Sequence, residues 1–427
     1  MELKAIYSKF LECTSVSTDT RKISNGYLFI ALRGDNFNAN TFAVEALEKG
    51  AKYVIIDQKE YYLDHKTILV DNCLETLQQL ANYHRKMLKT TIIGLTGSNG
   101  KTTTKELINA VLSKKYKTVA TIGNLNNHIG VPLTLLRLTN DTEIGIIEMG
   151  ANHQKEIDFL CTISQPDYGY ITNFGKAHLE GFGGVEGVIK GKSELFSYLK
   201  NQNKTAFINT DDPLQDSKSY DIDRYTFSNL KNDSDILIKV IDANPLVKVE
   251  FKNSEIQTNL IGIYNATNIS AAIAIGNYFS VSDFDIKDAI EHYIPENNRS
   301  QILIKNSKKI ILDAYNANPS SMNAALDNFF KIENGSKLAI LGDMFELGNF
   351  SIEEHKKIVL MANLQKNITF YFVGNLFYES KIINSRLHFF NSMDDFSGFL
   401  KNKKIDSNLI LIKGSRGMAL ERCLDFI

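Results

Sequence analysis

The sequence predicts an α/β protein with three domains and a mostly parallel sheet in the central one. At 427 residues the chain is about three times as long as a common domain. Short β-branched runs alternate with segments of helical periodicity, a pattern typical of parallel sheets covered by helices on both faces. The polar segment Pro295–Ser300 separates two such series, and we therefore expect domains at residues 1–85, 86–297 and 298–427.

A glycine-rich turn lies between a strand and a helix near the start of the central domain. The β-branched run Thr91–Ile93 precedes this turn, and apolar residues at helical spacing follow it from Lys105. Such a turn binds phosphates through backbone amides, while a lysine supplies charge and a hydroxyl reaches Mg²⁺. The general spacing of this motif would need glycine at Leu95, so the chain has a shorter variant. A glycine-rich turn can be purely structural, but the Lys-Thr-Thr-Thr run favours a nucleoside triphosphate, bound by Gly97, Ser98, Asn99, Gly100, Lys101, Thr102 and Thr103.

Composition excludes several other classes of protein. Lys and Arg together number 48 against 49 Asp and Glu, which gives no reason to expect a nucleic-acid partner. The cysteines at 13, 73, 161 and 423 are widely spaced, so we expect reduced core thiols rather than a disulfide framework or a zinc site. No apolar run approaches the roughly 20 residues of a membrane helix, and the start of the chain lacks a long apolar segment. We therefore expect a cytoplasmic protein with no membrane partner.

Residues 1–85 are expected to form a small α/β unit ahead of the phosphate-binding turn. Strands are predicted at 27–32 and 53–56, and helices at 41–49 and 73–87. Two polar clusters, Ser17–Arg21 and Arg33–Asn36, stand between these elements. On the residues alone they are typical of solvated turns, and a second ligand site is the alternative.

The central domain has two further strands that end in polar residues. They are predicted at Glu143–Glu148 and Asp167–Asn173, and the second runs on to His178. Because ligands of open α/β sheets bind beyond the carboxyl ends of strands, we expect Glu148, Asn173 and His178 beside the phosphate-binding turn. The segment 121–134, between the phosphate-binding turn and the strand at 143–148, is rich in asparagine. It is predicted to bind ligand through residues that include Asn124 and Asn127.

The second half of the central domain is expected to change character. One helix is predicted over 187–200, followed over 204–263 by short strands that form a meander covering the sheet. The pair Asp211–Asp212 before a proline is more typical of a turn than of a metal site. Beyond Gly262, the amides of Asn265 and Asn268 are predicted either to cap an alanine-rich helix or to read a base.

Strands and helices alternate again in the last domain, which predicts a Rossmann-like fold. The expected strands are at 309–313, 338–342, 369–373 and 409–413. Each of them leads into a polar loop, as a ligand-binding edge of a parallel sheet would require.

Taken jointly, the polar motifs resemble those of the Mur ligases, ATP-dependent amide-bond-forming enzymes of peptidoglycan synthesis, over essentially the whole chain. The motifs that carry the resemblance lie at residues 96–103, 123–132, 148–153, 177–183, 313–322, 342–348 and 413–416. The resemblance implies a UDP-sugar domain, a central ATPase and a C-terminal domain that helps to bind the incoming amino component. Within the family it points to a monomeric enzyme that joins D-alanyl-D-alanine to UDP-MurNAc-tripeptide through an acyl phosphate.

The resemblance also assigns roles to individual residues. Lys192 matches a lysine that the family carbamylates, and Lys190 is the competing position. Mg²⁺, in two ions, would be held by Thr102, Glu148, His178 and Lys192, with Lys101, Glu148, His178 and Lys192 as the catalytic set. ATP would further contact Asn268, Arg299, Asp313, Tyr315 and Asn316, and the other substrates would contact Thr18, Asp19, Arg21, Arg33, Asn124, Asn127 and Arg416.

The chain differs from the family pattern at a few positions, among them Tyr264, where a histidine is frequent, and the segment Phe37–Phe42. Another ligase of the family or a folylpolyglutamate synthase are rival interpretations, as is a nucleotide-dependent switch. The N-terminal domain disfavours the folate enzyme, and no guanine-reading Asn/Thr-Lys-x-Asp supports a switch.

Overall fold

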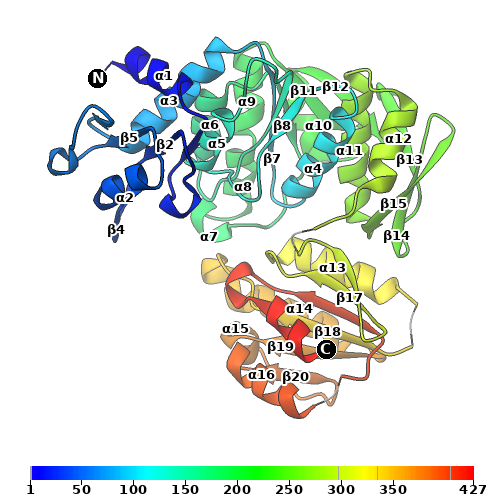
Figure 1. Ribbon diagram of the computed structural model, residues 1–427. Helices are drawn as coiled ribbons and strands as arrows, with labels where there is room; N and C mark the ends of the chain where they lie inside the picture. Colours follow the sequence, from blue (N-terminus) through cyan, green and yellow to red (C-terminus); the bar gives the residue numbers. More distant parts are fainter. Residues whose placement is uncertain (1, 297, 334, 404) are drawn as a thin grey trace.

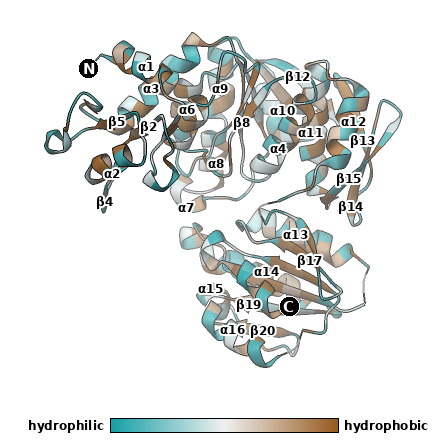
Figure 2. Cartoon of the chain, viewed as in Figure 1, coloured by the Kyte–Doolittle hydropathy of each residue, from teal (hydrophilic) through white to brown (hydrophobic). Residues whose placement is uncertain are grey.

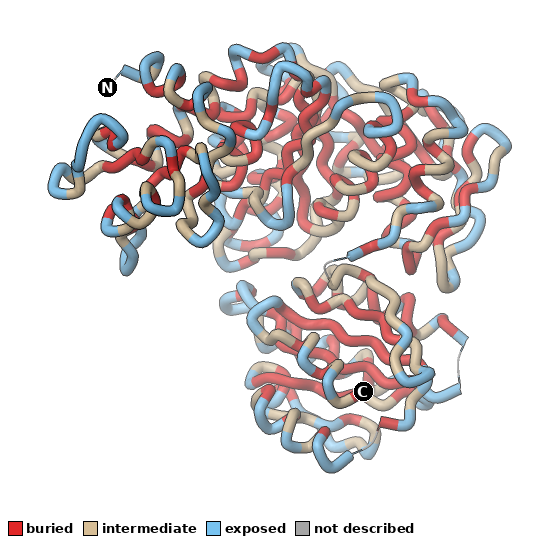
Figure 3. Tube along the Cα trace, in the orientation of Figure 1, coloured by how far each residue is buried: buried red, intermediate tan, exposed pale blue. Residues whose placement is uncertain are grey.

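The computed structural model of the protein describes residues 2–296, 298–333, 335–403 and 405–427. Three large sheets with their helices follow one another along the chain, besides a two-stranded β3–β4 sheet, and Figure 1 shows the last large sheet set below the other two. The strands form the apolar centre of each unit, brown in Figure 2 and largely buried in Figure 3. The predicted boundary at residue 297 falls outside the described residues, and the domain limits stay a prediction.

The N-terminal unit is a four-stranded parallel sheet in the order β1-β2-β5-β6. Its long helix α3 (Cys73–Met87) begins at Asn72, whose side chain accepts the free amides of the first turn. His84 on α3 bonds the Tyr7 hydroxyl at 3.2 Å and the carbonyl of Leu138 in the central unit at 2.9 Å, so α3 joins the two units. The remaining elements are α1 (Leu3–Leu11), β1 (Ser15–Ser17), η1 (Thr20–Lys22), β2 (Tyr27–Ile30), β3 (Arg33–Gly34), β4 (Phe37–Asn38), η2 (Ala39–Phe42), α2 (Ala43–Glu48), β5 (Tyr53–Ile56), η3 (Lys59–Tyr61) and β6 (Thr67–Leu69).

The central sheet has nine strands in the order β15-β14-β13-β12-β11-β10-β7-β9-β8. Each neighbouring pair in this order from β8 through β7 and β10 to β13 is parallel, and the pairs β13–β14 and β14–β15 are antiparallel. The prediction that residues 204–263 cover the sheet is therefore wrong, because their strands pair one after another beyond β10 and lengthen the sheet as far as β15. The strands are β7 (Thr91–Thr96), β8 (Thr118–Ala120), β9 (Ile144–Glu148), β10 (Tyr168–Ile171), β11 (Thr205–Asn209), β12 (Asp223–Ser228), β13 (Ile236–Asp242), β14 (Leu246–Phe251) and β15 (Ser254–Ile261).

Helices cover both faces of the central sheet. On one face α4 and α11 pack against each other, and their apolar residues share one core with α12. The expected single helix over 187–200 is two helices separated at Ser193, since Gly191 and Ser193 both weaken a helix locally. The helices are α4 (Lys101–Leu112), α5 (Gly130–Leu135), α6 (Glu156–Ser164), α7 (Leu179–Phe182), α8 (Val185–Lys192), α9 (Glu194–Asn201), α10 (Pro213–Ser219), α11 (Tyr264–Tyr278) and α12 (Asp283–His292).

The C-terminal unit is a six-stranded sheet in the order β16-β17-β21-β18-β19-β20, parallel except for the β16–β17 pair. The expected strands are confirmed within a residue, and β16 and β20 were not predicted. Its elements are β16 (Gln301–Lys305), β17 (Lys308–Asp313), α13 (Pro319–Lys331), β18 (Lys337–Gly342), η4 (Gly348–Phe350), α14 (Ser351–Asn363), β19 (Ile368–Val373), α15 (Asn375–Glu379), β20 (Leu387–Phe390), α16 (Met393–Asn402), β21 (Leu409–Lys413), η5 (Arg416–Met418) and η6 (Leu420–Phe426).

Polar contacts join the C-terminal unit to the central one. Lys176 reaches the carboxylate of Glu354 at 3.1 Å, and its backbone amide donates to Ser320 Oγ at 2.8 Å. The four cysteines are free thiols, as expected. No helix in the described part of the chain is long and apolar enough to span a membrane.

Candidate active site

The phosphate-binding turn lies between β7 and α4, as its sequence predicted. Gly97 has a φ of 141°, and a Cβ there would come within 1.9 Å of Thr172 Oγ1, so only glycine fits. Gly100, at a φ of 79°, is the left-handed residue from which α4 begins. From the end of β10, the Thr172 hydroxyl donates to the carbonyl of Asn99 at 2.6 Å, and Asn173 Oδ1 accepts the Asn99 amide at 3.1 Å. The turn is therefore held in shape by the neighbouring strand.

Lys101 lies folded over this turn. Its ammonium donates to the carbonyls of Gly97 at 2.7 Å and Ser98 at 3.3 Å, and burial lowers its pKa. Two backbone carbonyls are weak partners for a buried cation. The position is thus suited to exchange these contacts for phosphate oxygens.

A cleft of about 1390 Å³ opens in front of the turn, with walls from all three units. Its N-terminal wall includes Asn72, Glu75 and Gln78, on and just before α3. Glu148, Asn173 and His178 line it, which confirms that these strand-end residues lie beside the turn. The predicted site residues that line the cleft are Ser98, Asn99, Gly100, Lys101, Thr102, Thr103, Asn124, Asn127, Glu148, His178, Asn268, Arg299, Asp313, Tyr315 and Asn316.

Glu148, the last residue of β9, carries a buried and half-satisfied carboxylate. The residue is 1% exposed, and its Oε1 accepts from the Asn126 amide at 2.8 Å. Its Oε2 is buried and has no hydrogen-bond partner among the described residues. Because an unpaired buried carboxylate oxygen is unfavourable, this atom fits a position where a cation binds.

His178 lines the same cleft as Glu148, and Lys192 lies close to Lys101, which also lines it. His178 has a φ of 53°, and its Nδ1 is paired with the carboxylate of Glu346 from the C-terminal unit. Lys192 is 1% exposed, and its Nζ donates to the Ala151 carbonyl at 3.1 Å. Burial, together with the charge of Lys101, holds the pKa of Lys192 well below its ordinary value.

Lys190, the competing lysine on α8, faces elsewhere. It lines a separate hollow of about 650 Å³ together with Lys200 and Lys218. Lys192 lies close enough to Lys101 for the charge of Lys101 to lower its pKa. Of the two lysines, Lys192 is therefore the enclosed one, and Lys190 opens into a different hollow.

The fit of this site to Mg²⁺ depends on groups besides acidic residues. No cluster of three His, Cys, Asp or Glu side chains suited to a metal occurs in the described part of the chain. Mg²⁺ commonly keeps waters and substrate phosphates and uses only one or two carboxylates, so a single free oxygen on Glu148, in the same cleft as Thr102, is compatible with it. The residues therefore fit an ion that arrives with its nucleotide.

The C-terminal wall of the cleft is strongly polar. The guanidinium of Arg299 stacks on the Tyr315 ring at 3.7 Å, and its Nε is buried without a partner among the described residues. Asp313, at the end of β17, pairs with Lys413 at the end of β21 at 2.5 Å. Lys413, with its side chain 2% exposed, belongs to the motif at residues 413–416 but was not predicted as a site residue.

Asn268 and Asn318 connect the phosphate-binding segment to its neighbours. Asn268 Oδ1 accepts from the Thr104 hydroxyl at 3.0 Å, so the predicted capping role is wrong: no side chain caps α11. Asn318 Nδ2 donates to Asn99 Oδ1 at 2.7 Å, from the C-terminal unit to the turn itself. Sequence reasoning missed Asn318 as a site residue, although it stands in the polar loop after β17.

Several predicted substrate residues lie outside the cleft. Asp19 accepts from the Arg21 amide at 3.0 Å and pairs with its guanidinium at 2.8 Å, which is the turn that the residues alone suggested. Arg33 pairs with Asp57 at 3.0 Å. Arg416 is exposed and pairs with Glu421 at 3.1 Å. The predicted residues that do not line the cleft are Gly97, Lys192, Thr18, Asp19, Arg21, Arg33 and Arg416.

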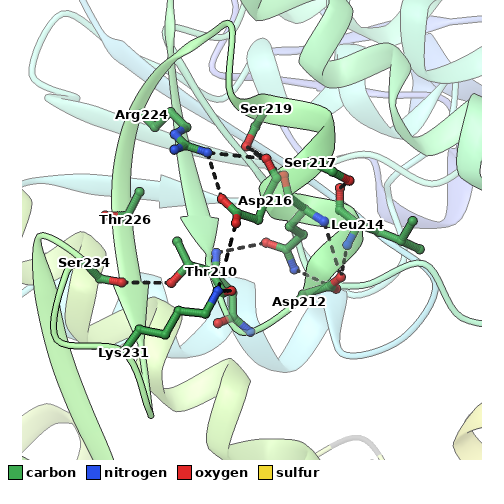
Figure 4. Close-up of polar contacts among 12 residues, drawn as sticks. Thr210, Asp212, Leu214, Asp216, Ser217, Ser219, Arg224, Thr226, Lys231 and Ser234 are labelled. Atoms are coloured by element: carbon green, nitrogen blue, oxygen red, sulfur yellow. Dashed lines mark hydrogen bonds and ion pairs between the residues drawn. The ribbon is translucent and has the colours of Figure 1, made fainter.

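The acidic pair before Pro213 forms a turn, as expected. Asp212 Oδ1 accepts from the amides of Leu214 and Gln215 at 2.9 and 3.3 Å and so begins α10. Figure 4 shows this cap beside Asp216, which pairs with Arg224 at 2.9 Å. These carboxylates are used by local structure.

A phosphate-binding turn at the carboxyl end of an inner strand of a parallel sheet, facing two further domains across one cleft, defines a nucleotide-dependent α/β enzyme. Family models match nearly the whole chain: "Mur ligase family, catalytic domain" over residues 12–85, "Mur ligase middle domain" over 95–276 and "Mur ligase, glutamate ligase domain" over 298–416. The chain belongs to the Mur ligase family, and the resemblance of its motifs is confirmed.

Individual relatives match over similar lengths. UDP-N-acetylmuramoyl-tripeptide–D-alanyl-D-alanine ligase of Bacillus subtilis (strain 168) is 35% identical over 95% of this chain and 91% of its own. The ligase of the same name from Escherichia coli (strain K12) is 32% identical over 95% and 92%. MurF from Acinetobacter baumannii superposes with a TM-score of 0.84 at 28% identity, over 99% of this chain and 97% of that one. MurF ligase from Thermotoga maritima, in complex with ADP, gives 0.83 at 27% identity, over 98% and 97%.

Proposed function

We propose that this chain ligates D-alanyl-D-alanine to UDP-N-acetylmuramoyl-tripeptide with ATP, giving the pentapeptide precursor of peptidoglycan, ADP and phosphate. The reaction is the one that the names of its relatives describe. The observation that carries the proposal is the shared cleft, where the phosphate-binding turn faces α3 on one side and Arg299 and Asp313 on the other. A ligase that joins two substrates at the expense of a third needs three binding surfaces that meet at one point.

Nucleotide binding is the first step. The amides of residues 98–102 would receive the phosphates, and Lys101 would exchange its carbonyl partners for phosphate oxygens. Arg299 would add its unpaired Nε from across the cleft. These fixed donors offset the charge that gathers on the transferred phosphoryl group.

Chemistry then proceeds in two transfers. A carboxylate oxygen of the tripeptide attacks the γ-phosphorus, the bond to the β–γ bridging oxygen breaks, and ADP leaves behind an acyl phosphate. The amine of D-alanyl-D-alanine attacks the acyl carbon, loses a proton, and expels phosphate as the amide forms. No protein nucleophile is required, so the chain contributes positions and charges, not a covalent intermediate.

We place Mg²⁺ at Thr102, Glu148, His178 and a carbamylated Lys192. The ion, when bound, shields the charge of the β- and γ-phosphates. What supports Glu148 is its free buried oxygen, and what supports His178 is its place on the same cleft. His178 would have to leave Glu346 to bind the ion.

The modification of Lys192 is supported by its surroundings. The amine is enclosed and donates to the neutral carbonyl of Ala151. In its neutral form the nitrogen would attack CO₂, form an N–C bond and release a proton, leaving a carbamate. That group presents anionic oxygens, which Mg²⁺ prefers to nitrogen.

The remaining assignments concern the substrates and the state of the protein. The pairs of Arg21 with Asp19 and of Arg33 with Asp57 hold both guanidinium groups on the N-terminal unit, where we place the UDP-sugar with Thr18. Asn124 and Asn127 line the route from there to the turn, and Arg416 is proposed to meet the incoming dipeptide. We propose that the enzyme works as a monomer in the cytoplasm, with domains 1–85, 86–297 and 298–427.

The decisive measurement is phosphate release from ATP with UDP-MurNAc-tripeptide, with and without D-alanyl-D-alanine. Release should require the dipeptide, and L-alanyl-L-alanine serves as a matched control for chirality. Lys101→Ala should abolish release in both cases. Dipeptide-independent release from the wild-type chain would overturn the proposed function.

A further inference from the structure

Tyr264, at the start of α11, reaches from the central unit to the hinge that leads to the C-terminal unit. Its hydroxyl lies 2.9 Å from Ser300 Oγ, and both residues line the cleft. Burial and the nearby carboxylate of Asp313 raise the pKa of Tyr264. The phenol is therefore neutral at physiological pH and is able to donate its hydrogen.

The hinge residues that Tyr264 contacts have an unusual backbone. Ser300 and Asn298 have φ angles of 50° and 57°, in the left-handed region that residues other than glycine seldom adopt. Such conformations persist only where surrounding contacts hold them. Ser300 is 7% exposed and its amide donates to Asp313 Oδ1 at 3.2 Å, while the carbonyl of Asn298 accepts from the Tyr315 amide at 3.2 Å.

Arg299 lies between these two left-handed residues, so their backbone sets the direction of its side chain. The guanidinium stacks on Tyr315, and its charge is close enough to Lys101 to lower the pKa of that lysine. A change in the backbone at Ser300 would therefore move a charge that faces the phosphates.

Two residues of the C-terminal unit contact the hinge: Asp313 accepts from the Ser300 amide, and the Tyr315 amide donates to the Asn298 carbonyl. Tyr264 supplies the contact from the other side. A continuous polar path thus runs from Tyr264 through Ser300 and Asp313 to Lys413, across the hinge. Without the phenol hydroxyl, the hinge would lose this link to the central unit.

We propose that Tyr264 is a positioning residue that ties the hinge backbone to the central unit and so directs Arg299 toward the bound nucleotide. The inference rests on the proposed function, because it takes the cleft as the place where the nucleotide phosphates bind. It concerns a position at which this chain differs from the pattern of its family.

The test compares Tyr264→Phe, Ser300→Ala and the double variant in the full chain. Either single change removes the same hydrogen bond, so each should raise the Kd for ADP, measured by calorimetry, and the KM for ATP about three- to tenfold. The KM for D-alanyl-D-alanine should stay within twofold. The Kd of the double variant for ADP should be no higher than the higher of the two single-variant values, because the two residues act through one bond.

Tyr116→Phe is the matched control. Its hydroxyl donates to the Phe279 carbonyl at 2.7 Å, in a contact inside the central unit, so its loss should affect stability but not the affinity for ADP. Hydrogen exchange adds a readout of position: the Ser300 amide should exchange faster in Tyr264→Phe than in Tyr116→Phe.

The inference is overturned if Tyr264→Phe binds ADP with wild-type affinity, or if the effects of the two single variants add. ADP binding and hydrogen exchange do not require the ligase reaction. A wild-type chain that releases phosphate without the dipeptide would therefore refute the proposed function, while these two measurements still decide the role of Tyr264.

Discussion

Replacing Lys192 with methionine separates the packing role of this side chain from its chemical role. The lysine is 1% exposed, and its amine has one hydrogen bond, to Ala151, and a contact with the Phe182 ring at 5.0 Å. Methionine has nearly the same length and no charge. Losing the hydrogen bond costs roughly 0.5–1.5 kcal/mol, and no longer burying an amine offsets a similar amount. We therefore expect the free energy of unfolding to change by less than about 1 kcal/mol.

The activity of the same variant should fall much further. If the carbamate of Lys192 supplies oxygen ligands beside Glu148, its removal takes away an electrostatic group at the reacting phosphates. Such losses typically lower kcat about 10²- to 10³-fold. Phosphate release gives the rate, and chemical denaturation gives the stability of the same preparation.

Lys190→Met is the control, since Lys190 faces the separate hollow and should retain activity within about twofold. Acetate, a small carboxylate, should partly restore the activity of Lys192→Ala. High CO₂ should raise the activity of a wild-type preparation that has lost part of its carbamate. Activity of Lys192→Met within a few-fold of wild type would refute the reasoning, as would an equal loss in Lys190→Met.

Further predictions concern the turn, the C-terminal wall and the first interface. Gly97→Ala should lose ADP binding and about 1–3 kcal/mol of stability, because its Cβ would meet Thr172 Oγ1 at 1.9 Å. Lys413→Met should lower the free energy of unfolding by about 1–3 kcal/mol, because the carboxylate of Asp313, which lines the cleft, loses a charged hydrogen-bond partner. Burial lowers the pKa of His84 below its ordinary value of 6.5, so the folded chain binds fewer protons and its stability should fall as the pH drops below 6.5. His84→Gln should remove that part of the pH dependence.

Each of these outcomes has a clear opposite. Isothermal calorimetry that finds wild-type ADP affinity in Gly97→Ala would show that the turn relaxes around a Cβ. A Lys413→Met chain as stable as wild type in denaturant would show that water in the cleft compensates Asp313 for the lost partner. Parallel stability–pH curves for wild type and His84→Gln would assign the acid sensitivity to other groups.

The elements whose signals are local in the chain were predictable. The turn at Gly97–Lys101 was found because its glycines, lysine and hydroxyl are neighbours in sequence, and the structure places them between β7 and α4. Helix α3 was predicted over residues 73–87 from its apolar spacing, and the structure gives the same bounds, with Asn72 as its cap. The convergence of Glu148 and His178 followed from the rule that parallel strands end at one edge.

What depends on partners far apart in the sequence was decided only by the tertiary structure. The strands of 204–263 were recognised, but whether they cover or extend a sheet is set by which edge is free to pair. Lys190 and Lys192 differ by two residues, and only the packing of α8 shows that one is enclosed and the other opens to a separate hollow.

The same holds for the contacts between units. Asn318 with Asn99, Glu346 with His178 and Tyr264 with Ser300 are each joined across a domain boundary. The residue types alone identified a nucleotide site and its family, because phosphate binding needs particular groups in a fixed local order. How the hinge turns Arg299 toward that site is a property of side chains and backbone angles that meet only when the chain is folded.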